Sequence, residues 1–466
     1  MPWSTREFHL LKPLPENMKL KSLLYIFNPA KRADDALQKV EGAAPSQSYW
    51  MMVRKQLGKN KLAVYCLRVV YFLIALAAFA DVLANEKPLA CSYNNHVYFP
   101  VFRSYTVSMG INQWPAELQN VEWKKLDYNW SLFPPIPYLP GNIDEANVHS
   151  VSPFATQQVK STRWRHWLGT DELGHDVFAA MIYGTRIALM VGIIAMSIAT
   201  LIGLLLGSLA GYFGDDRLKI SRIGLMFNGL FFILGIFYAF GIRSYALNDA
   251  LASSSLSFFG QLIFSLIIFM AAMTVGNLLA LPFNRLPFLG KKISIPMDII
   301  VSRIIEIMIS IPTLFLIIAI VAIAKPSLML VMLVIGATTW TGIARFVRAE
   351  LLRIRSLEYI EAAHALGYSE LRTIFRHALP NALSPVLIAI AFGIASAILT
   401  EATLSFLGIG VPADTLTWGA LLSEARSKPT AWWLAIFPGI AIFITVTVYN
   451  LLGEGLTDAM DPRLRK

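Results

Sequence analysis

The chain has 466 residues, of which 56% are hydrophobic and only 15% are charged. Soluble domains carry about 25% charged residues, so this composition excludes an ordinary soluble protein and favours several membrane spans of about 20 residues each. The formal net charge is +10. We assign this charge to cytoplasmic loops, because no soluble segment carries the basic stripe that nucleic-acid binding requires.

Residues 1–61 are mostly polar and carry an excess of Lys and Arg. This excess predicts a cytoplasmic N-terminal tail. The first apolar run, 62–83, starts too far along the chain for a typical removable signal peptide, so we expect it to be the first transmembrane helix. Residues 84–178 lose the basic excess and are rich in aromatics and prolines. We expect this part to be an extracytoplasmic segment of irregular or β-rich structure.

The next part of the chain alternates apolar runs with basic loops. Residues 179–214 predict the second span, which ends in the sequence Gly-Tyr-Phe-Gly. Two further uncharged runs, at about 223–242 and 258–283, lie within residues 215–296. Basic residues flank this pair on its outer sides, so we expect a hairpin that leaves the cytoplasm and returns to it.

Residues 297–466 contain the remaining apolar runs, at about 299–324, 327–344, 382–410 and 432–452. The sequence therefore predicts an all-α polytopic membrane protein with about eight spans. With eight spans both termini lie in the cytoplasm, and every basic cluster then falls on that side of the membrane.

A polar segment, 346–381, interrupts the apolar runs and is cytoplasmic in this topology. Good helix formers precede Gly367, which suits the left-handed conformation that ends a helix. Ser369 is a candidate N-cap for a second helix, in which Arg372 follows and which Pro380 ends. The sequence thus predicts two short helices joined at a glycine. These residues leave two roles open: an amphipathic connector on the membrane surface, or a docking element for another protein.

The order of residues in this segment resembles the EAA loop of ABC importer permeases. Glu361, Ala362 and Ala363 are followed four residues later by Gly367, and Leu-Pro comes near the end. Three other blocks, in the same order along the chain, resemble the dipeptide/oligopeptide permease group. They are HWLGTDELGHD at 166–176 with IYGTR after it, LTEATLSFLG at 399–408, and YNLLGEGLTD at 449–458 with DPRLR after it.

The resemblance implies a permease core of six spans, with 215–296 as an inserted two-span region. It also implies a second homologous permease subunit, cytoplasmic ABC ATPase subunits, an extracytoplasmic solute-binding protein and a peptide or peptide-like substrate. The location would be the bacterial inner membrane, with the lipid bilayer around the spans. The start of the outer segment, 80–89 and 98–100, is similar to the branch linked to microcin C and longer peptides. His175 departs from the group, which usually has arginine there.

In that family the loop is the coupling helix that docks on the ATPase and passes on its motion. The matching positions here are Glu361, Ala362, Ala363 and Gly367. We add Ser369, Arg372 and Pro380 to the coupling element because they shape its second helix.

The sequence lacks motifs for nucleotide binding, metal binding and hydrolysis. No Gly-x-x-x-x-Gly-Lys-Ser/Thr phosphate loop occurs, so we expect ATP and Mg to be bound by the partner ATPase subunits. The histidines form no pair with metal-ligand spacing, and there is no Gly-x-Ser-x-Gly elbow. Cys66 and Cys91 suggest no disulfide. We therefore expect a transport subunit without a catalytic site, a metal site or a cofactor of its own.

Charged residues within spans are candidates for function. Glu306 lies one helical turn after Arg303, so it either forms a local ion pair or contributes to the translocation path or gate. Glu401 either faces that path or makes polar contacts between helices. Gly203 and Gly207 allow close helix packing, within the chain or against a partner subunit.

Two further expectations concern shape and function. Pro312 and Pro438 lie in the middle of predicted spans and predict kinks. The alternative to a permease is a non-transporting membrane scaffold or sensor, in which the coupling loop is a relic and the extra hairpin binds another membrane protein.

Overall fold

A computed structural model describes residues 49–460, apart from 120, 254, 287, 324 and 413. Most of the predicted N-terminal tail and the basic residues after 460 therefore lie outside the described residues. The chain divides into two units, Met1–Gln56 and Leu57–Lys466. Within the first unit, the described residues are those at the start of helix α3 (Tyr49–Lys59). The rest of the described fold belongs to the second unit.

The described residues contain seven helices that are long and apolar enough to cross a membrane, or up to eight if a bent pair counts as one span. The seven are α4 (Lys61–Ala78), α7 (Val177–Ser208) with the π-turn η4 (Leu209–Phe213), α8 (Arg222–Ile236) with η5 (Phe237–Gly241), α10 (Ser255–Phe283), α13 (Leu328–Ile354), α16 (Leu379–Phe406) and α18 (Trp433–Met460). The predicted class is confirmed as a mostly helical protein with several membrane spans.

The predicted single span at 299–324 is broken in the structure. It consists of α11 (Met297–Ser310) and α12 (Thr313–Ile323), which are bent by 82°. The break falls at Pro312, and Ile311 before it has extended backbone (φ −95°, ψ 125°). A residue that precedes proline is pushed out of the helical region, so the break has a local cause. Pro438, by contrast, stays inside α18.

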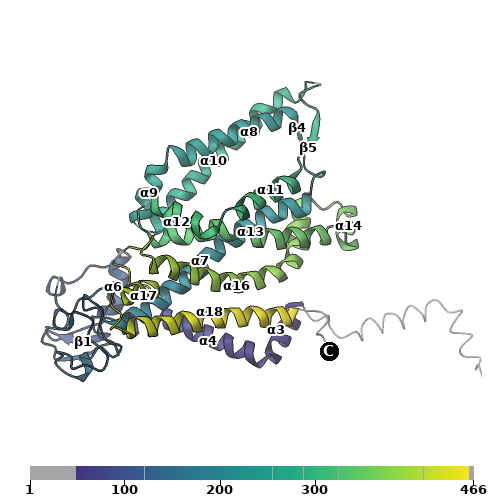
Figure 1. Cartoon of the computed structure of the whole chain (residues 1–466). Helices are drawn as coiled ribbons and strands as arrows, with labels where there is room; N and C mark the ends of the chain where they lie inside the picture. Colours follow the sequence, from purple (N-terminus) through teal and green to yellow (C-terminus); the bar gives the residue numbers. More distant parts are fainter. Residues whose placement is uncertain are drawn as a thin grey trace, which may run out of the picture. The chain divides into compact units, whose positions relative to one another are not determined.

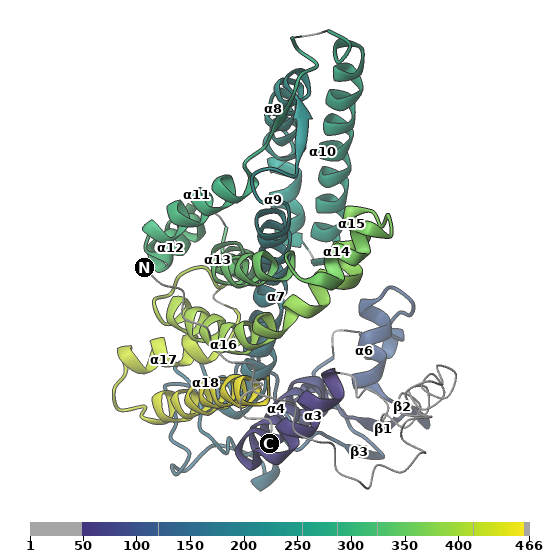
Figure 2. The same cartoon turned by 90° about the vertical axis from the view of Figure 1, so that its right-hand side faces the viewer.

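The centre of the second unit is the contact between α7 and α13, with α16 packed against both and α18 against α16 (Figures 1 and 2). Small residues allow the close approach. A Cβ on Gly203 would lie 2.7 Å from Ile343 Cγ2, and one on Gly207 would lie 2.7 Å from the Ala344 carbonyl oxygen. The glycine pair therefore packs within the chain, which decides the alternative that the sequence left open.

The two ends of the region 215–296 meet. Strand β4 (Lys219–Ser221) pairs antiparallel with β5 (Lys292–Ser294), and the amide of Met297 donates to the Gly214 carbonyl at 3.1 Å. Between these strands, α8 and α10 run side by side and are joined through α9 (Ser244–Ser253) (Figure 1). The predicted helical hairpin is present, and it leaves and rejoins the rest of the fold at one place.

The segment after the first span contains a small sheet. Strands β1 (Ala90–Tyr93), β2 (His96–Tyr98) and β3 (Trp130–Leu132) pair antiparallel in the order β2-β1-β3. The short helical elements are α5 (Ala80–Leu83), α6 (Pro100–Ser108), η1 (Ala116–Leu118), η2 (Glu145–Asn147) and η3 (Thr162–Trp164). Cys66 and Cys91 are buried and do not pair.

A buried histidine holds this segment to the start of α7. His166 has no exposed surface; its Nδ1 lies 2.7 Å from Asp176 Oδ2 and its Nε2 lies 3.0 Å from Asp144 Oδ2. Asp176 is also the N-cap of α7 and accepts from the Ala179 amide. Burial alone would lower the pKa of His166, but the two carboxylates raise it above its usual value. The hydrogen bond from His166 lowers the pKa of Asp144 to about 2.

These shifts predict a pH-dependent stability. The raised pKa of His166 contributes stability that is fully present below about pH 6.5 and is lost as the pH rises through the folded-state pKa. The lowered pKa of Asp144 contributes stability above about pH 4, which is lost as the pH falls towards 2. We expect the unfolding temperature of the purified protein to fall between about pH 6 and pH 9 and this slope to flatten in His166→Gln. An equally steep slope in the variant would contradict the assignment.

Candidate functional site

The predicted helix–turn–helix is present at the polar segment. Helix α14 (Glu358–Ala365) ends before Gly367, whose φ is +77°. The side chain of Ser369 then accepts from the Arg372 amide and caps α15 (Glu370–Thr373). A left-handed glycine followed by a capping serine reverses the chain within a few residues. In Figure 1, α14 lies at the end of the helical bundle opposite to the strand β1.

The expectation that Pro380 ends the second helix is wrong. After α15 the chain forms a π-turn, η6 (Ile374–Ala378), and continues directly into α16. The amide of Leu379 bonds to the carbonyl of Ile374, five residues back. Proline lacks an amide donor and its ring clashes with the carbonyl four residues before it. At the start of α16, just after a π-turn, both constraints are satisfied. The coupling element is therefore continuous with a transmembrane helix.

The segment has a buried face and an exposed face. The buried residues Ile360, Ile374 and Ala378 belong to one hydrophobic cluster with the ends of α7 and α13, and Ala363 is also buried. The exposed residues are Glu361, Ala362, Gly367, Ser369, Arg372 and Pro380, together with Leu366, Leu371 and Phe375. Large apolar side chains that remain exposed beside charged ones are typical of a protein interaction surface. The sequence alone did not single out these three apolar residues.

A tyrosine in the π-turn that follows α7 joins this segment to the bundle. Tyr212 is fully buried in η4; its hydroxyl donates to Glu370 Oε2 at 2.8 Å and lies 3.1 Å from His364 Nε2. One hydroxyl thus contacts both helices of the turn. The signal in the sequence was the Gly-Tyr-Phe-Gly end of the second span, but nothing local to it pointed to residues more than 150 positions away.

A close approach and an ion pair fix the surroundings of Tyr212. A Cβ on Gly211 would lie 2.6 Å from the Arg348 carbonyl oxygen, so the π-turn η4 and α13 are in close contact here. Arg348 Nη2 donates to Asp298 Oδ2 at 2.9 Å, which joins α13 to the start of α11. The ends of three helices and the coupling segment are therefore mechanically connected.

We expect Tyr212→Phe to keep the fold and weaken the connection. Phenylalanine fills the same space but removes the hydroxyl that His364 and Glu370 share. Because both of these side chains keep access to solvent, we expect a cost of about 0.5–1.5 kcal/mol for the lost hydrogen bond. Transport should fall severalfold while ATP hydrolysis by the assembled complex falls less. The ratio of solute transported to ATP hydrolysed in proteoliposomes measures this, and an unchanged ratio would exclude Tyr212 from coupling. Phe213→Leu, a neighbouring change without loss of a hydroxyl, is the control.

The two charged candidates in the spans lie in different surroundings. Glu306 is exposed on α11 and forms the ion pair with Arg303 that the spacing predicts, at 2.5 Å. Glu401 on α16 is only 2% exposed and accepts from Ser405 Oγ at 2.6 Å. No hydrogen bond in the described residues joins Glu306 to Glu401 or either of them to the coupling segment. Glu306, Glu401 and the coupling segment therefore lie at three separate positions and do not form one site.

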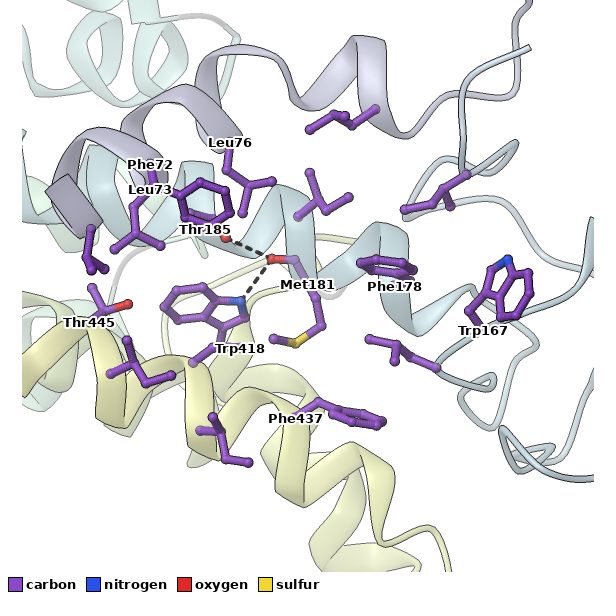
Figure 3. A pocket seen from close by; sticks show the side chains of 18 of the residues that line it. Phe72, Leu73, Leu76, Trp167, Phe178, Met181, Thr185, Trp418, Phe437 and Thr445 are labelled. Atoms are coloured by element: carbon purple, nitrogen blue, oxygen red, sulfur yellow. Dashed lines mark hydrogen bonds between the residues drawn. The ribbon is translucent and has the colours of Figure 1, made fainter.

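A large apolar cavity of about 680 Å³ lies between α4, α7, α18 and α17 (Trp418–Ser427). Its wall contains no charged side chain. Figure 3 shows Trp418 at its centre; Trp418 Nε1 and Thr185 Oγ1 both donate to the Met181 carbonyl, at 3.1 Å each. The indole N–H and the threonine hydroxyl thus have hydrogen-bond partners within the otherwise apolar wall. None of the site residues predicted from the sequence lines this cavity.

Taken together, the spanning helices and the coupling-type segment define a polytopic membrane permease. Comparisons agree with this class. The family described as "Binding-protein-dependent transport system inner membrane component" matches residues 288–466, and the "N-terminal TM domain of oligopeptide transport permease C" matches residues 48–100. The chain belongs to this family of binding-protein-dependent permeases, and its resemblance to the dipeptide/oligopeptide group is confirmed.

Three curated relatives show how far the similarity extends. The dipeptide transport system permease protein DppC of Alkalihalophilus pseudofirmus is 30% identical over 301 residues, 64% of this chain and 73% of that protein. The inner membrane ABC transporter permease protein YejE of Escherichia coli is 28% identical over 422 residues, 90% of this chain and 97% of that protein. The oligopeptide transport system permease protein OppC of Bacillus subtilis is 28% identical over 302 residues, 65% of this chain and 73% of that protein.

Proposed function

We propose that this chain forms half of the translocation path of an ATP-driven importer for peptides or peptide-like solutes. The observation that carries the proposal is the coupling segment, whose inner face is built into the bundle and whose outer face exposes Leu366, Leu371 and Phe375. The printed names of the relatives, which include dipeptide and oligopeptide permeases, support the substrate class. The similarity to the ABC transporter permease protein YejE, which covers 97% of that protein, supports the transporter class. Membership of the branch suggested by residues 80–89 is part of the proposal.

The proposed partners follow from the two ends of the bundle. Cytoplasmic ATPase subunits dock on α14 and α15, and they bind and hydrolyse the ATP. An extracytoplasmic solute-binding protein approaches the opposite end, where the small sheet lies (Figure 1). A second homologous permease completes the path. We place the chain in the bacterial inner membrane with eight spans, counting α11 and α12 as one, and with both termini in the cytoplasm.

The mechanism uses two rigid connections. Movement of α14 and α15 with the closing ATPase pair is passed to α16 through the continuous helix that follows Ser369, and to α7 through the hydroxyl of Tyr212. Because α7 and α13 are in tight glycine-mediated contact, they move together. The two permeases then change which side of the membrane is open to the path. Glu306 and Glu401 remain candidates for that path or its gate.

Uptake and co-purification test this function. Deleting the gene in cells that lack other peptide transporters should abolish uptake of a labelled tripeptide, and the intact gene should restore it. Gentle solubilisation through a tag on this chain should yield an ATPase and a second permease in equal amounts. Undiminished uptake, or a chain purified without an ATPase, would instead favour the non-transporting scaffold.

A further inference from the structure

A small cavity of about 350 Å³ lies where α16 ends and α17 begins. It is at the end of the bundle that carries the small sheet, away from the coupling segment (Figure 1). Hydroxyl groups and one carboxylate line it, from Ser405, Thr415, Ser423, Glu424 and Ser427, and no cationic side chain does. Gly408, Val411, Pro412 and Ala420 form the rest of the wall. A carboxylate and several hydroxyl oxygens without a cation favour a positively charged ligand with several N–H donors.

Glu424 is the charged group of this cavity. In the described residues it forms no salt bridge, although the charge of His175 favours its ionised form. Its Oε1 accepts from the Glu172 amide at 2.5 Å, and in the described residues no hydrogen bond reaches Oε2. Burial, together with the charges of Asp171 and Glu172, raises the pKa of Glu424 to about 6. At neutral pH the carboxylate is therefore charged in an environment that disfavours its charge, and an arriving cation would relieve this cost.

The nearby cationic groups are already engaged by other acids. Lys428 Nζ donates to Glu172 Oε2 at 2.5 Å and to the His149 carbonyl at 2.9 Å. His175 Nδ1 lies 2.6 Å from Asp171 Oδ2. These contacts clamp the loop before α7 against α17 and present the Glu172 amide to Glu424. His175, which stands where the permease group usually has arginine, thus helps to hold the loop beside this cavity.

The cavity is also connected to the buried carboxylate of α16. Ser405 lines the cavity and donates its hydroxyl hydrogen to Glu401 Oε1 at 2.6 Å. With its hydrogen used in this way, the Ser405 oxygen is left as an acceptor towards the cavity. Glu401 therefore acts here by orienting a hydroxyl and does not itself line the cavity.

We propose that this cavity is an outer subsite of the permease that binds the ammonium group of the transported solute, the N-terminus of a peptide, through Glu424 and the hydroxyl oxygens around it. The inference rests on the proposed peptide import. An ammonium group offers three N–H donors, and its pairing with a half-buried carboxylate is a charge-assisted hydrogen bond, which is stronger than a neutral one.

The direct test measures peptide binding to the solubilised importer with the solute-binding protein left out, so that only the permease can discriminate. The probes are trialanine and N-acetyl-trialanine, compared by saturation-transfer NMR titration. We expect the importer to bind trialanine about tenfold more tightly, the value of one charge-assisted hydrogen bond. Glu424→Gln keeps an acceptor for the Glu172 amide and should lose this preference, whereas Glu424→Asp should keep part of it.

Asp127→Asn removes an exposed carboxylate elsewhere on the outer segment and should leave the preference unchanged. Equal binding of the two peptides by the unaltered importer would overturn the subsite, and so would an unchanged preference in Glu424→Gln. Uptake of trialanine into proteoliposomes, with the binding protein and ATP present, separates this result from the proposed function. Uptake without the binding preference overturns the subsite alone, and no uptake of any peptide overturns the importer.

Discussion

Replacing Gly207 with isoleucine is expected to prevent the accumulation of folded permease. A Cβ at this position would lie 2.7 Å from the Ala344 carbonyl oxygen and 2.8 Å from Val347 Cβ, so the new side chain meets the backbone of α13. Overpacking of this kind costs about 1–3 kcal/mol or more, and here it falls on the most extensive helix contact of the fold. The amount of monodisperse protein after detergent extraction measures the effect, and we expect it to fall at least about tenfold.

A second glycine gives a matched control. Gly229 also lies within a spanning helix, α8, but a Cβ there would meet nothing within 4 Å. Gly229→Ile should accumulate like the unaltered protein, because it adds the same side chain without a clash. If both variants accumulate equally, the packing of α7 on α13 does not limit folding.

Replacing Gly367 with valine is expected to leave the protein in the membrane but to uncouple it. No atom lies within 4 Å of a Cβ at this position, so the obstacle is not space. The obstacle is the backbone, because φ is +77° and a β-branched residue there is strained by about 1–3 kcal/mol. The turn should open, and the exposed residues of α14 and α15 would lose their relative placement. We expect ATPase co-purification and peptide uptake to fall about tenfold, with membrane content unchanged.

An asparagine at the same position distinguishes the effect of straining the turn from the effect of replacing glycine as such. Asn tolerates the left-handed conformation far better than Val, so Gly367→Asn should keep most of the co-purified ATPase. Normal assembly of the valine variant would show that the turn does not position the docking surface. A loss of membrane content would show instead that the segment is needed for folding.

Much of the fold could be predicted because it depends on properties of short stretches. Runs of apolar residues located the spanning helices, since a helix in lipid must be apolar along its length. The turn of the coupling segment was equally predictable, because the conformational freedom of Gly367 and the capping side chain of Ser369 act within a few residues. The order of motifs along the chain was sufficient for the family, which the comparisons confirm.

Proline shows the limit of local reasoning. Pro312 breaks a span by 82°, Pro438 stays inside α18, and Pro380 follows a π-turn in a helix that it was expected to end. The same ring has three outcomes, because whether a helix breaks depends on the packing of the residues around it and on the bonds that the neighbouring turns can rearrange.

Only the tertiary structure decided the contacts that make these elements act together. The amino-acid sequence by itself determined the membrane class, most of the spans and the coupling turn, since hydrophobicity and backbone preference belong to each residue and its neighbours. It did not reveal that Tyr212 joins both helices of that turn, that Gly207 faces α13, or that the Glu172 amide donates to Glu424 beside a cavity. Each of these contacts joins residues far apart in the chain, and their proximity arises from the packing of whole helices, which no local pattern encodes.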